Sequence, residues 1–390
     1  MGVIDRIKAF HPELTEIRRD LHAHPETAFE ENRTADIVAD KLQSWGLEIH
    51  RGLAKTGVVG TLKAGRANRA IGLRADMDAL DLIELNEFGH KSRHEGKMHG
   101  CGHDGHTVML LGAAKYLSEN RNFDGTVHFI FQPAEENLAG GKVMIDDGLF
   151  EKFPVESVYG MHNMPGLEVG KFAVRVGPMM ASADMFTVKV RGVGAHGAYP
   201  HKGVDTVLVA SEMVVALQSI VARNVDPLEP AVISVTMFQS GHTTNVIPEH
   251  ALLGGTVRAF RPEVQDLLER RMREVLDGIA RAHGAEVELD YQRRYPPTIN
   301  TADETELAAA AAGMVVGPEN VVHNMAPSMG AEDFAWMLRE RPGSYVWIGN
   351  GAGEGSCMVH NPRYDFNDEV LPIGSSYWVR LVETILKPAA

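Results

Sequence analysis

Residues 69–77, RAIGLRADM, form a short apolar run that predicts a buried strand, and the helix-like TVMLLGAAKYLSEN follows at 107–120. The alternation continues with the strand-like start of GTVHFIFQPAEE at 125–136, then KVMIDDGLF at 142–150 and SVYGMHN at 157–163. Strands and helices that alternate in this way favour an α/β layer with a mixed, largely parallel sheet flanked by helices. In such sheets ligands bind at the carboxyl ends of the strands, where several polar residues of this chain fall.

A different order of elements begins near Ala183. It reads strand, helix, two strands, helix and strand, at 185–192, 204–224, 231–239, 251–260, 263–284 and 285–294. This order is typical of a small α+β, ferredoxin-like domain. We therefore predict an inserted domain at 183–293 and a discontinuous first domain at 1–182 and 294–390, with the Pro-rich YPPTIN marking the return.

The composition limits the classes of partner. The 390 residues include 52 acidic and 38 basic side chains, a formal charge of -14, and this excess of negative charge argues against a nucleic-acid partner. Only two cysteines occur, Cys101 and Cys357, so we expect no disulfide framework and a cytoplasmic location. No apolar run approaches the roughly 20 residues that span a bilayer, and we expect no membrane attachment.

The stretch HEGKMHGCGHDGHT at 94–107 holds the densest group of metal-binding residue types in the chain. Its glycines allow a tight turn, so that near neighbours such as Cys101 and His103 can face one ion. A lone cysteine with flanking histidines indicates a metal site or a catalytic site. The alternative is a polar loop with incidental histidines.

Two adjacent carboxylates, Glu135 and Glu136, follow Pro133 at the end of a strand-like run. Adjacent residues that leave a strand point in different directions, so one carboxylate can ligate a metal while the other faces a metal-activated water. Taken alone, a pair of adjacent glutamates is more typical of a solvated surface.

Two isolated histidines complete the candidate ligands. His162 follows the apolar start of SVYGMHNMPG, and His360 lies in CMVHNPRYDF near the C-terminus. Each alone would be an ordinary structural histidine. Together with the two preceding groups they supply the number and kind of ligands that two first-row ions require.

The chain resembles the aminoacylase and carboxypeptidase-G-like dinuclear metallohydrolases, in the branch of hippurate hydrolases and plant auxin-conjugate amidohydrolases. The resemblance runs from end to end and rests on RRDLHAHPE, RADMDAL, HGCGHDGHT, FQPAEE, GMHNMPG, GPMMAS, GAHGAYPHKGVD, TNVIP, GTVRAF, MGAEDF and MVHNPRYDF in this order. It implies hydrolysis of the amide bond of small N-acyl amino acids, with benzoyl, acetyl or related acyl groups, to a carboxylic acid and a free amino acid.

The resemblance also implies two divalent ions in each subunit, which can be zinc, manganese, cobalt or nickel. Cys101 stands where other branches carry a bridging aspartate, so we expect its thiolate between the two ions. We expect His103 and His162 on one ion, and Glu136 and His360 on the other. The implied ligands are thus Cys101, His103, Glu136, His162 and His360.

Further roles follow from the same resemblance. Glu135 is the implied general base, and Asp78 is expected to orient a ligand imidazole. The inserted domain resembles a lid and dimerisation domain, which implies a homodimer or a dimer-based oligomer in which His196 reaches the scissile carbonyl of the partner's site. Asn245 and Arg258 resemble groups that grip the substrate carboxylate, although a loop cap and a surface ion pair are the alternatives.

Other interpretations stay open. A dipeptidase or carboxypeptidase of the same fold is one, and a non-catalytic protein that keeps a metal for structure is a remote second. His22 and His24, in the His-x-His sequence of HAHPE, are expected to be structural. Cys357 is expected to be a packed thiol, although it precedes His360 by only three residues.

Overall fold

The chain divides into two compact units in the computed structural model, which describes residues 2–136, 138–351 and 357–388. Unit 1 comprises Met1–Gly177, Ile299–Ala326 and Asp333–Ala390. Unit 2 comprises Pro178–Thr298 and Pro327–Glu332. The insertion expected at 183–293 lies within unit 2.

Unit 2 also includes the short segment 327–332, which the sequence pattern places in the first domain. The reason is backbone pairing with the segment around Met180. The amide of Ala181 donates to the carbonyl of Ser328 over 3.0 Å, and the amide of Ser328 donates to the carbonyl of Met179 over 3.0 Å. The sequence contains no local signal for this pairing.

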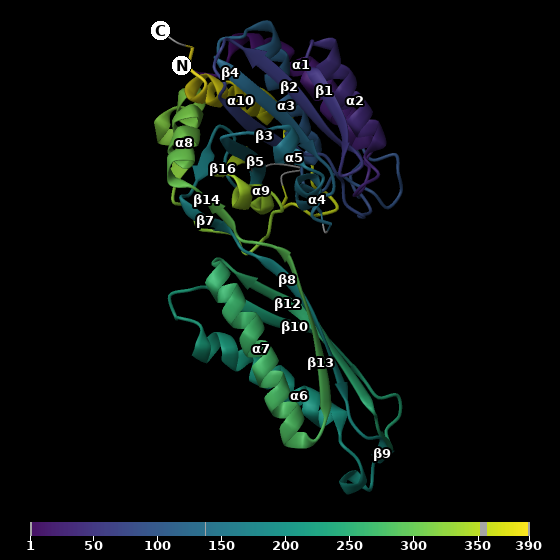
Figure 1. The fold of residues 1–390 in the computed structure, drawn as a ribbon. Coiled ribbons are helices and arrows are strands. Elements are labelled where there is room, and N and C mark those ends of the chain that lie inside the picture. The colour runs from purple at the N-terminus through teal and green to yellow at the C-terminus, as the bar shows by residue number, and fades with distance from the viewer. Residues whose placement is uncertain (1, 137, 352–356, 389–390) are drawn as a thin grey trace. The chain divides into compact units, whose positions relative to one another are not determined.

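Unit 1 is built on an eight-stranded sheet in the order β1-β2-β4-β3-β5-β16-β6-β15 (Figure 1). The inner strands β4, β3, β5 and β16 are parallel to one another, whereas the pairs β1–β2, β2–β4 and β16–β6 are antiparallel. The sheet is therefore mixed, as the alternation of strands and helices predicted. Its strands are β1 (Glu48–Leu53), β2 (Gly57–Ala64), β3 (Ala70–Asp76), β4 (Gly125–Gln132), β5 (Ser157–Pro165), β6 (Phe172–Val174), β15 (Val321–His323) and β16 (Gly343–Gly351).

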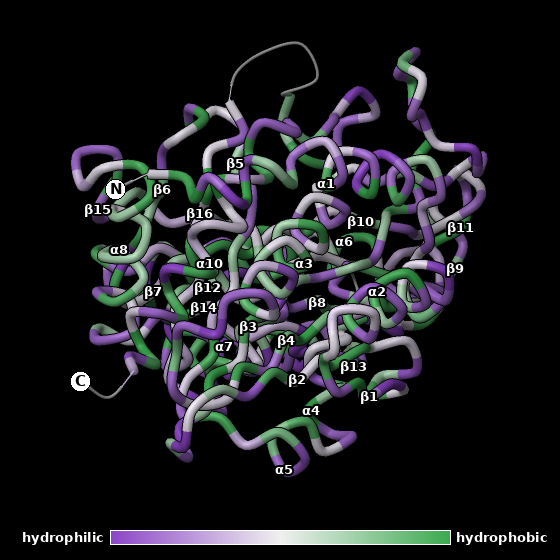
Figure 2. Tube along the Cα trace, turned by 90° about the horizontal axis from the view of Figure 1, so that it is seen from above, coloured by the Kyte–Doolittle hydropathy of each residue, from purple (hydrophilic) through white to green (hydrophobic). Residues whose placement is uncertain are grey.

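Helices flank this sheet and form a core with it. The apolar face of α1 packs on α3, and α10 packs on both α3 and α8. Figure 2 shows many apolar residues, in green, along α3 and α10, while purple hydrophilic residues are common in the connecting segments. The helices of unit 1 are α1 (Asp5–Ala23), α2 (Asn32–Ser44), α3 (His103–Glu119), α4 (Gly140–Asp146), α5 (Leu149–Lys152), α8 (Ala302–Val316), α9 (Ala335–Glu340) and α10 (Leu371–Ile385).

Unit 2 has a four-stranded antiparallel sheet in the order β10-β12-β8-β13. Both long helices, α6 and α7, pack on one face of it (Figure 1). This is the ferredoxin-like arrangement expected from the order of elements. The elements are β8 (Ala183–Arg191), α6 (Thr206–Asn224), β10 (Ala231–Ser240), β12 (His250–Ala259), α7 (Pro262–His283) and β13 (Glu286–Tyr295), with a small ribbon of β9 (Ala195–His196) and β11 (Val246–Ile247). Two short strands, β7 (Gly177–Met180) and β14 (Thr298–Asn300), lie where the chain enters and leaves unit 2.

The expectation that no apolar run approaches the length of a membrane span was too strong. Helix α6 has 19 residues and is long and apolar enough by length and composition alone, and 33% of its 18-residue apolar window is buried. Its inner face, including Val209, Met213 and Leu217, belongs to the core of unit 2. A core helix of this kind passes the same test as a membrane span, so the finding is weak support for insertion.

Candidate metal centre and catalytic groups

The candidate site of unit 1 lies at the carboxyl ends of three parallel strands. Strand β3 ends at Asp76, directly opposite Gln132 at the end of β4, and β5 is the other neighbour of β3. Asp78 follows β3, Glu135 and Glu136 follow β4, and His162 lies on β5. Because parallel strands end at the same edge of a sheet, this topology gathers their side chains.

The start of α3 and the residues just before it bring two more candidate ligands to this edge. Cys101 and His103 are both buried and flank Gly102, which has a φ of 95°. A Cβ atom at Gly102 would lie 2.1 Å from Oδ1 of Asn163 and 2.6 Å from the hydroxyl of Tyr364. Only glycine therefore fits this turn, which directs both neighbours toward β5.

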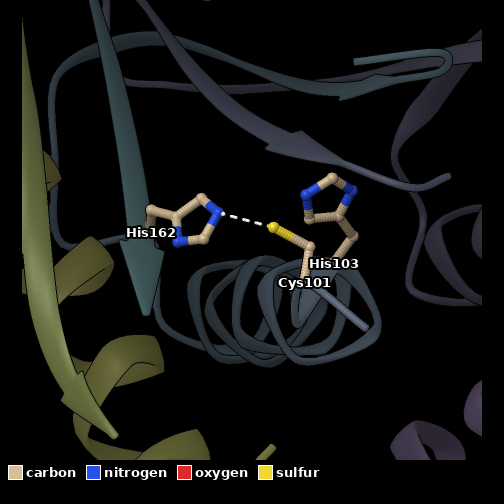
Figure 3. A group of neighbouring side chains, drawn as sticks. All are labelled: Cys101, His103 and His162. Atoms are coloured by element: carbon tan, nitrogen blue, oxygen red, sulfur yellow. Dashed lines mark hydrogen bonds between the residues drawn. The ribbon is translucent and has the colours of Figure 1, made fainter. Parts of the chain in front are cut away.

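His162 and Cys101 approach each other across this edge. Figure 3 shows the ring of His162 pointing from its strand toward the sulfur of Cys101, with His103 beside it. Nε2 of His162 lies 3.3 Å from Sγ of Cys101. His162 also donates from Nδ1 to the backbone carbonyl of Asn163 over 2.7 Å, which leaves Nε2 as the lone-pair nitrogen on the side of the thiol.

Besides Asp76, His103 and His106, three groups of side chains in the described part of unit 1 have ligand atoms that all lie within 4.8 Å of one another. Cys101, His103 and His162 form one group, Cys101, Glu136 and His360 form a second, and His103, Glu135 and Glu136 form a third. Cys101 thus belongs to two groups, as the sulfur of a bridging ligand would. Nε2 of His360 lies 3.0 Å from Oε1 of Glu136, and the backbone amide of His360 donates to the carbonyl of Gly100 over 2.6 Å.

Asp78 orients His103. Nδ1 of His103 donates to Oδ1 of Asp78 over 3.2 Å, and Oδ2 of Asp78 accepts the amide of Glu136 over 2.9 Å. A carboxylate on one ring nitrogen fixes the tautomer whose other nitrogen can bind a metal. Nε2 of His103 is buried and has no hydrogen-bond partner in the described chain. A buried nitrogen without a partner is costly, so a cation is a fitting occupant of this position.

The acidities of these groups agree with a cation site. Burial, followed by the charge of Glu136, raises the pKa of the Cys101 thiol well above its usual value. Burial lowers the pKa of His162, so this imidazole stays neutral, the form that binds metals. Burial also disfavours the charged form of His103, but the charges of Asp76 and Cys101 and the hydrogen bond with Asp78 together outweigh burial and raise the pKa. A thiol and an imidazole that bind a cation must both lose their protons, which the positive charge of the ion favours.

The segment after β4 makes a tight turn before it reaches the two glutamates. Ala134 is fully buried and has a φ of 55°, a left-handed conformation that is uncommon outside glycine. Oε1 of Glu135 accepts the amide of Asp333 over 3.3 Å. Oε1 of Glu31 accepts the amide of Ala134 over 2.9 Å. Sequence reasoning did not find Glu31, because its partner is a backbone group of a distant segment.

A buried hydrogen-bonded network behind the ligands was also missed. Nδ1 of His106 lies 2.7 Å from Oδ1 of Asp76, and Nε2 of His106 accepts the amide of Asn163 over 3.0 Å. The amide nitrogen of the Asn163 side chain donates to the hydroxyl of Tyr364 over 2.7 Å. Both nitrogens of His106 are thus engaged, which leaves neither for a metal. The three-residue spacing from His103 to His106 on one helix face was the available signal.

Three other predicted site residues belong to unit 2. His196 and Asn245 lie together, because His196 pairs with Val246 in the β9–β11 ribbon and the amide of Gly197 donates to the carbonyl of Asn245 over 2.8 Å. The His196 side chain is exposed. Arg258 lies on β12 and is half-buried, and burial lowers its pKa more than the charge of Asp184 raises it.

The residues expected to be structural occupy ordinary surroundings. His22 is buried, with Nδ1 2.9 Å from Asp104 and Nε2 3.3 Å from Glu84. His24 lies with Nδ1 2.8 Å from the carbonyl of Asp20. Cys357 is a free, partly buried thiol that packs against the core of unit 1.

Comparisons with known proteins extend over nearly the whole chain. Residues 72–384 match the model of peptidase family M20/M25/M40. The chain is 43% identical to the hippurate hydrolase of Campylobacter jejuni over 99% of its length and 100% of the relative. It is 38% identical to an N-acetylcysteine deacetylase of Bacillus subtilis, over 97% of this chain and 98% of that one. Among solved structures, the Bacillus subtilis YXEP protein, described as a dinuclear metal binding peptidase from the M20 family, has a TM-score of 0.85 at 36% identity and covers 97% of this chain and 99% of its own.

Proposed function

Because this chain belongs to peptidase family M20/M25/M40, we propose that it is a metal-dependent amidohydrolase that cleaves the amide bond of small N-acyl amino acids. The names of its relatives, hippurate hydrolase and N-acetylcysteine deacetylase, both describe the removal of an acyl group from an amino acid. The products would be a carboxylic acid and a free amino acid.

The observation that carries this proposal is the pair of ligand groups that share Cys101. The residues that would hold two divalent ions are Cys101, His103, Glu136, His162 and His360. We assign Cys101 as the bridging thiolate, His103 and His162 to one ion, and Glu136 and His360 to the other. Zinc, manganese, cobalt and nickel all accept this mixture of thiolate, imidazole and carboxylate. A thiolate ligand of this kind stays functional in a reducing compartment, which supports a cytoplasmic location.

When bound, the ions would lower the pKa of a water molecule toward about 7 and would polarise the scissile carbonyl. Glu135 would take the proton of this water and deliver it to the nitrogen of the leaving amino acid. The hydrogen bond from the amide of Asp333 to Oε1 of Glu135 holds that carboxylate in one orientation. Asp78 would keep the ring of His103 in the tautomer that offers Nε2.

His196 would stabilise the oxyanion from a second subunit. The amide of Ala198 donates to Nδ1 of His196 over 3.0 Å, so the neutral ring carries its proton on Nε2. An exposed imidazole with a free Nε2–H is a suitable donor to a developing negative charge, and one such donor contributes about 3 kcal/mol. Asn245, beside His196, and Arg258, half-buried on β12, would bind the substrate carboxylate.

A homodimer would form through the outer surface of unit 2. Strand β10 is at the edge of its sheet, and its Phe238 is 47% exposed. Helix α6 presents Leu208 and Val215 to solvent, with exposed fractions of 50% and 73%. An open strand edge beside an apolar helix face favours pairing with a second copy of the chain.

One experiment tests both the base and the partner histidine. Glu135→Gln should bind two metal ions per subunit and lose at least about 1,000-fold in kcat on N-benzoyl-glycine, because the proton acceptor is gone. His196→Ala should lose about 100-fold or more. A heterodimer of the two variants, co-expressed and purified through two different tags, should regain about half of the wild-type activity, because one of its two sites then has both Glu135 and the partner's His196.

The metal content and the parent dimers serve as controls for this heterodimer. A heterodimer as inactive as its parents would disprove action across the dimer. Wild-type activity in Glu135→Gln would disprove the role of the base. Preference for glycyl dipeptides over N-acyl amino acids in a side-by-side assay would favour a dipeptidase or carboxypeptidase of the same fold.

A further inference from the structure

Glu31 is a buried carboxylate that lies between α1 and α2, outside every candidate ligand group. Its side chain is 0% exposed. Oε1 accepts the amide of Ala134 over 2.9 Å and that of Phe29 over 3.0 Å, and Oε2 accepts the hydroxyl of Thr56 over 2.6 Å. The one carboxylate thus joins three segments of unit 1 that are distant in sequence.

Both amides on Oε1 come from residues in the left-handed conformation. Phe29 has a φ of 62° and Ala134 a φ of 55°. Residues other than glycine adopt this conformation only where the surroundings compensate for it. On its other side, the carbonyl of Ala134 accepts the amide of Gly140 over 2.9 Å. Glu31 is the side-chain acceptor that holds this unfavourable turn.

The turn held in this way directs Glu135. The amide of Ala134 is bound by Glu31, and the amide of Glu136 is bound by Asp78 over 2.9 Å. Glu135 is the single residue between these two anchored amides. Because two carboxylates fix the backbone on either side of it, the direction in which Glu135 leaves the strand is set by Glu31 and Asp78 together.

Stability alone gives little reason for a carboxylate at this position. Burial, with the charge of Asp78 as a further cause and despite the bond from Thr56, raises the pKa of Glu31 to about 7. A buried charge needs extensive hydrogen bonding to be tolerated, and neutral residues often replace it without loss of stability. A buried carboxylate with three hydrogen-bond donors at position 31 therefore indicates a role in function rather than in stability alone.

We propose that Glu31 is a positioning residue for catalysis, which locks the turn at Ala134 so that Glu135 faces the reacting water. This inference rests on the proposed function, because it takes Glu135 as the general base. Glu31 itself would not contact the substrate or the ions.

The test compares three variants of the full-length, metal-loaded protein. Glu31→Ala removes the acceptor and should lower kcat on N-benzoyl-glycine about 100-fold with KM changed less than about threefold, because the base is misdirected while binding is retained. Glu31→Gln keeps one oxygen for both amides and should retain kcat within about threefold. Glu26→Ala is the matched control, since Glu26 accepts the amides of Arg33 and Thr34 at the start of α2 and does not touch the turn. It should keep kcat within about twofold.

A second readout is independent of activity. Hydrogen exchange of the amide of Ala134 should be at least about tenfold faster in Glu31→Ala than in the wild type, and unchanged in Glu26→Ala. If Glu31→Ala does not fold, Glu31→Asp, which withdraws the carboxylate by one methylene, should show the same loss of kcat and the same faster exchange.

Three results would overturn the proposal. They are an unchanged kcat in a folded Glu31→Ala, an equal loss of kcat in Glu26→Ala, and unchanged exchange at Ala134. If the wild type hydrolyses no N-acyl amino acid, the proposed function fails on its own. The exchange of Ala134 then still decides whether Glu31 anchors the turn.

Discussion

Asp78 connects the two halves of the candidate metal centre through its two oxygens. One accepts from the ring of His103 and the other from the backbone of Glu136, and these two residues are assigned to different ions. The carboxylate is buried and lies two residues after the end of β3, a central strand, which limits where it can lie. A change at Asp78 should therefore affect the affinity for both ions.

Asp78→Asn should raise the Kd for zinc about 10- to 100-fold, because the amide cannot accept both hydrogen bonds and the ring of His103 loses its fixed tautomer. Competition with a chromophoric chelator measures this affinity. Asp146→Asn is a suitable control, since Asp146 is exposed and forms an ion pair with Lys142 at the surface. Equal zinc affinity in Asp78→Asn and the wild type would contradict the assigned role.

Site residues that are close together in the sequence can be predicted from it. Residues whose hydrogen-bond partners are distant in the sequence cannot. Cys101 and His103 stand in one glycine-rich stretch, so their proximity can be expected without a structure. Glu31 and Ala134 are 103 residues apart, and the partner is a backbone amide that every residue type offers. No residue pattern marks such a contact. The spacing of His106 from His103 can be seen in the sequence. The contacts of its two ring nitrogens cannot, because they are made with Asp76 and Asn163 on two different strands.

At the scale of elements, the start of α3 depends on one glycine. Gly102 combines a φ of 95° with close contacts to Asn163 and Tyr364. The helix therefore begins at a position where the backbone of the turn touches β5, and this contact sets the distance between Cys101 and His162.

Gly102→Ala should lower the free energy of unfolding of the metal-free protein by about 3 kcal/mol or more, because a methyl group adds overpacking to an unfavourable φ. Gly170→Ala is the matched control. Gly170 has a φ of 83° but nothing lies within 4 Å of its added Cβ, so only the conformational penalty of about 1 kcal/mol applies. Urea unfolding measures both, and equal losses would show that the contact with β5 is unimportant.

Helices and strands of unit 1 can be predicted where strand-like apolar runs alternate with helical stretches. Strands β3, β4 and β5 and the helices between them follow from that pattern. The position of β16 does not, because Gly343–Gly351 is far along the chain from β5, its parallel neighbour in the sheet. Sequence periodicity identifies a strand, but the pairing of strands depends on tertiary packing.

At the scale of the whole molecule, a buried ionic cluster joins the N-terminal helix to the rest of unit 1. Arg18 donates to Asp365 over 2.6 Å and to Asp368 over 2.7 Å, and His22 lies against Asp104 and Glu84. Burial lowers the pKa of His22, but the bonds with Asp104 and Glu84 outweigh it and raise the pKa from 6.5 to about 9.

The raised pKa of His22 predicts a pH-dependent stability. Its contribution is complete below pH 6.5 and is lost as the pH rises to about 9, because the unfolded imidazole has already released its proton. The wild type should lose up to about 3 kcal/mol of unfolding free energy over this range from His22 alone. His22→Gln should be less stable at pH 6 and show a flatter dependence above it. Urea unfolding of the metal-free protein at several pH values checks this, and identical slopes would contradict the prediction.

Unit 1 is discontinuous in sequence, and this has a consequence for biosynthesis. A ribosome would deliver Cys101, His103, Glu136 and His162 first, then all of unit 2, and only afterwards β16 and His360. Domains generally fold as they emerge, so unit 2 can fold while the large sheet still lacks an inner strand. The growing polypeptide would then hold the candidate metal centre without His360, one of its assigned ligands. The proposed activity would begin only after His360 has been translated, which keeps a shorter nascent chain from acting on substrate.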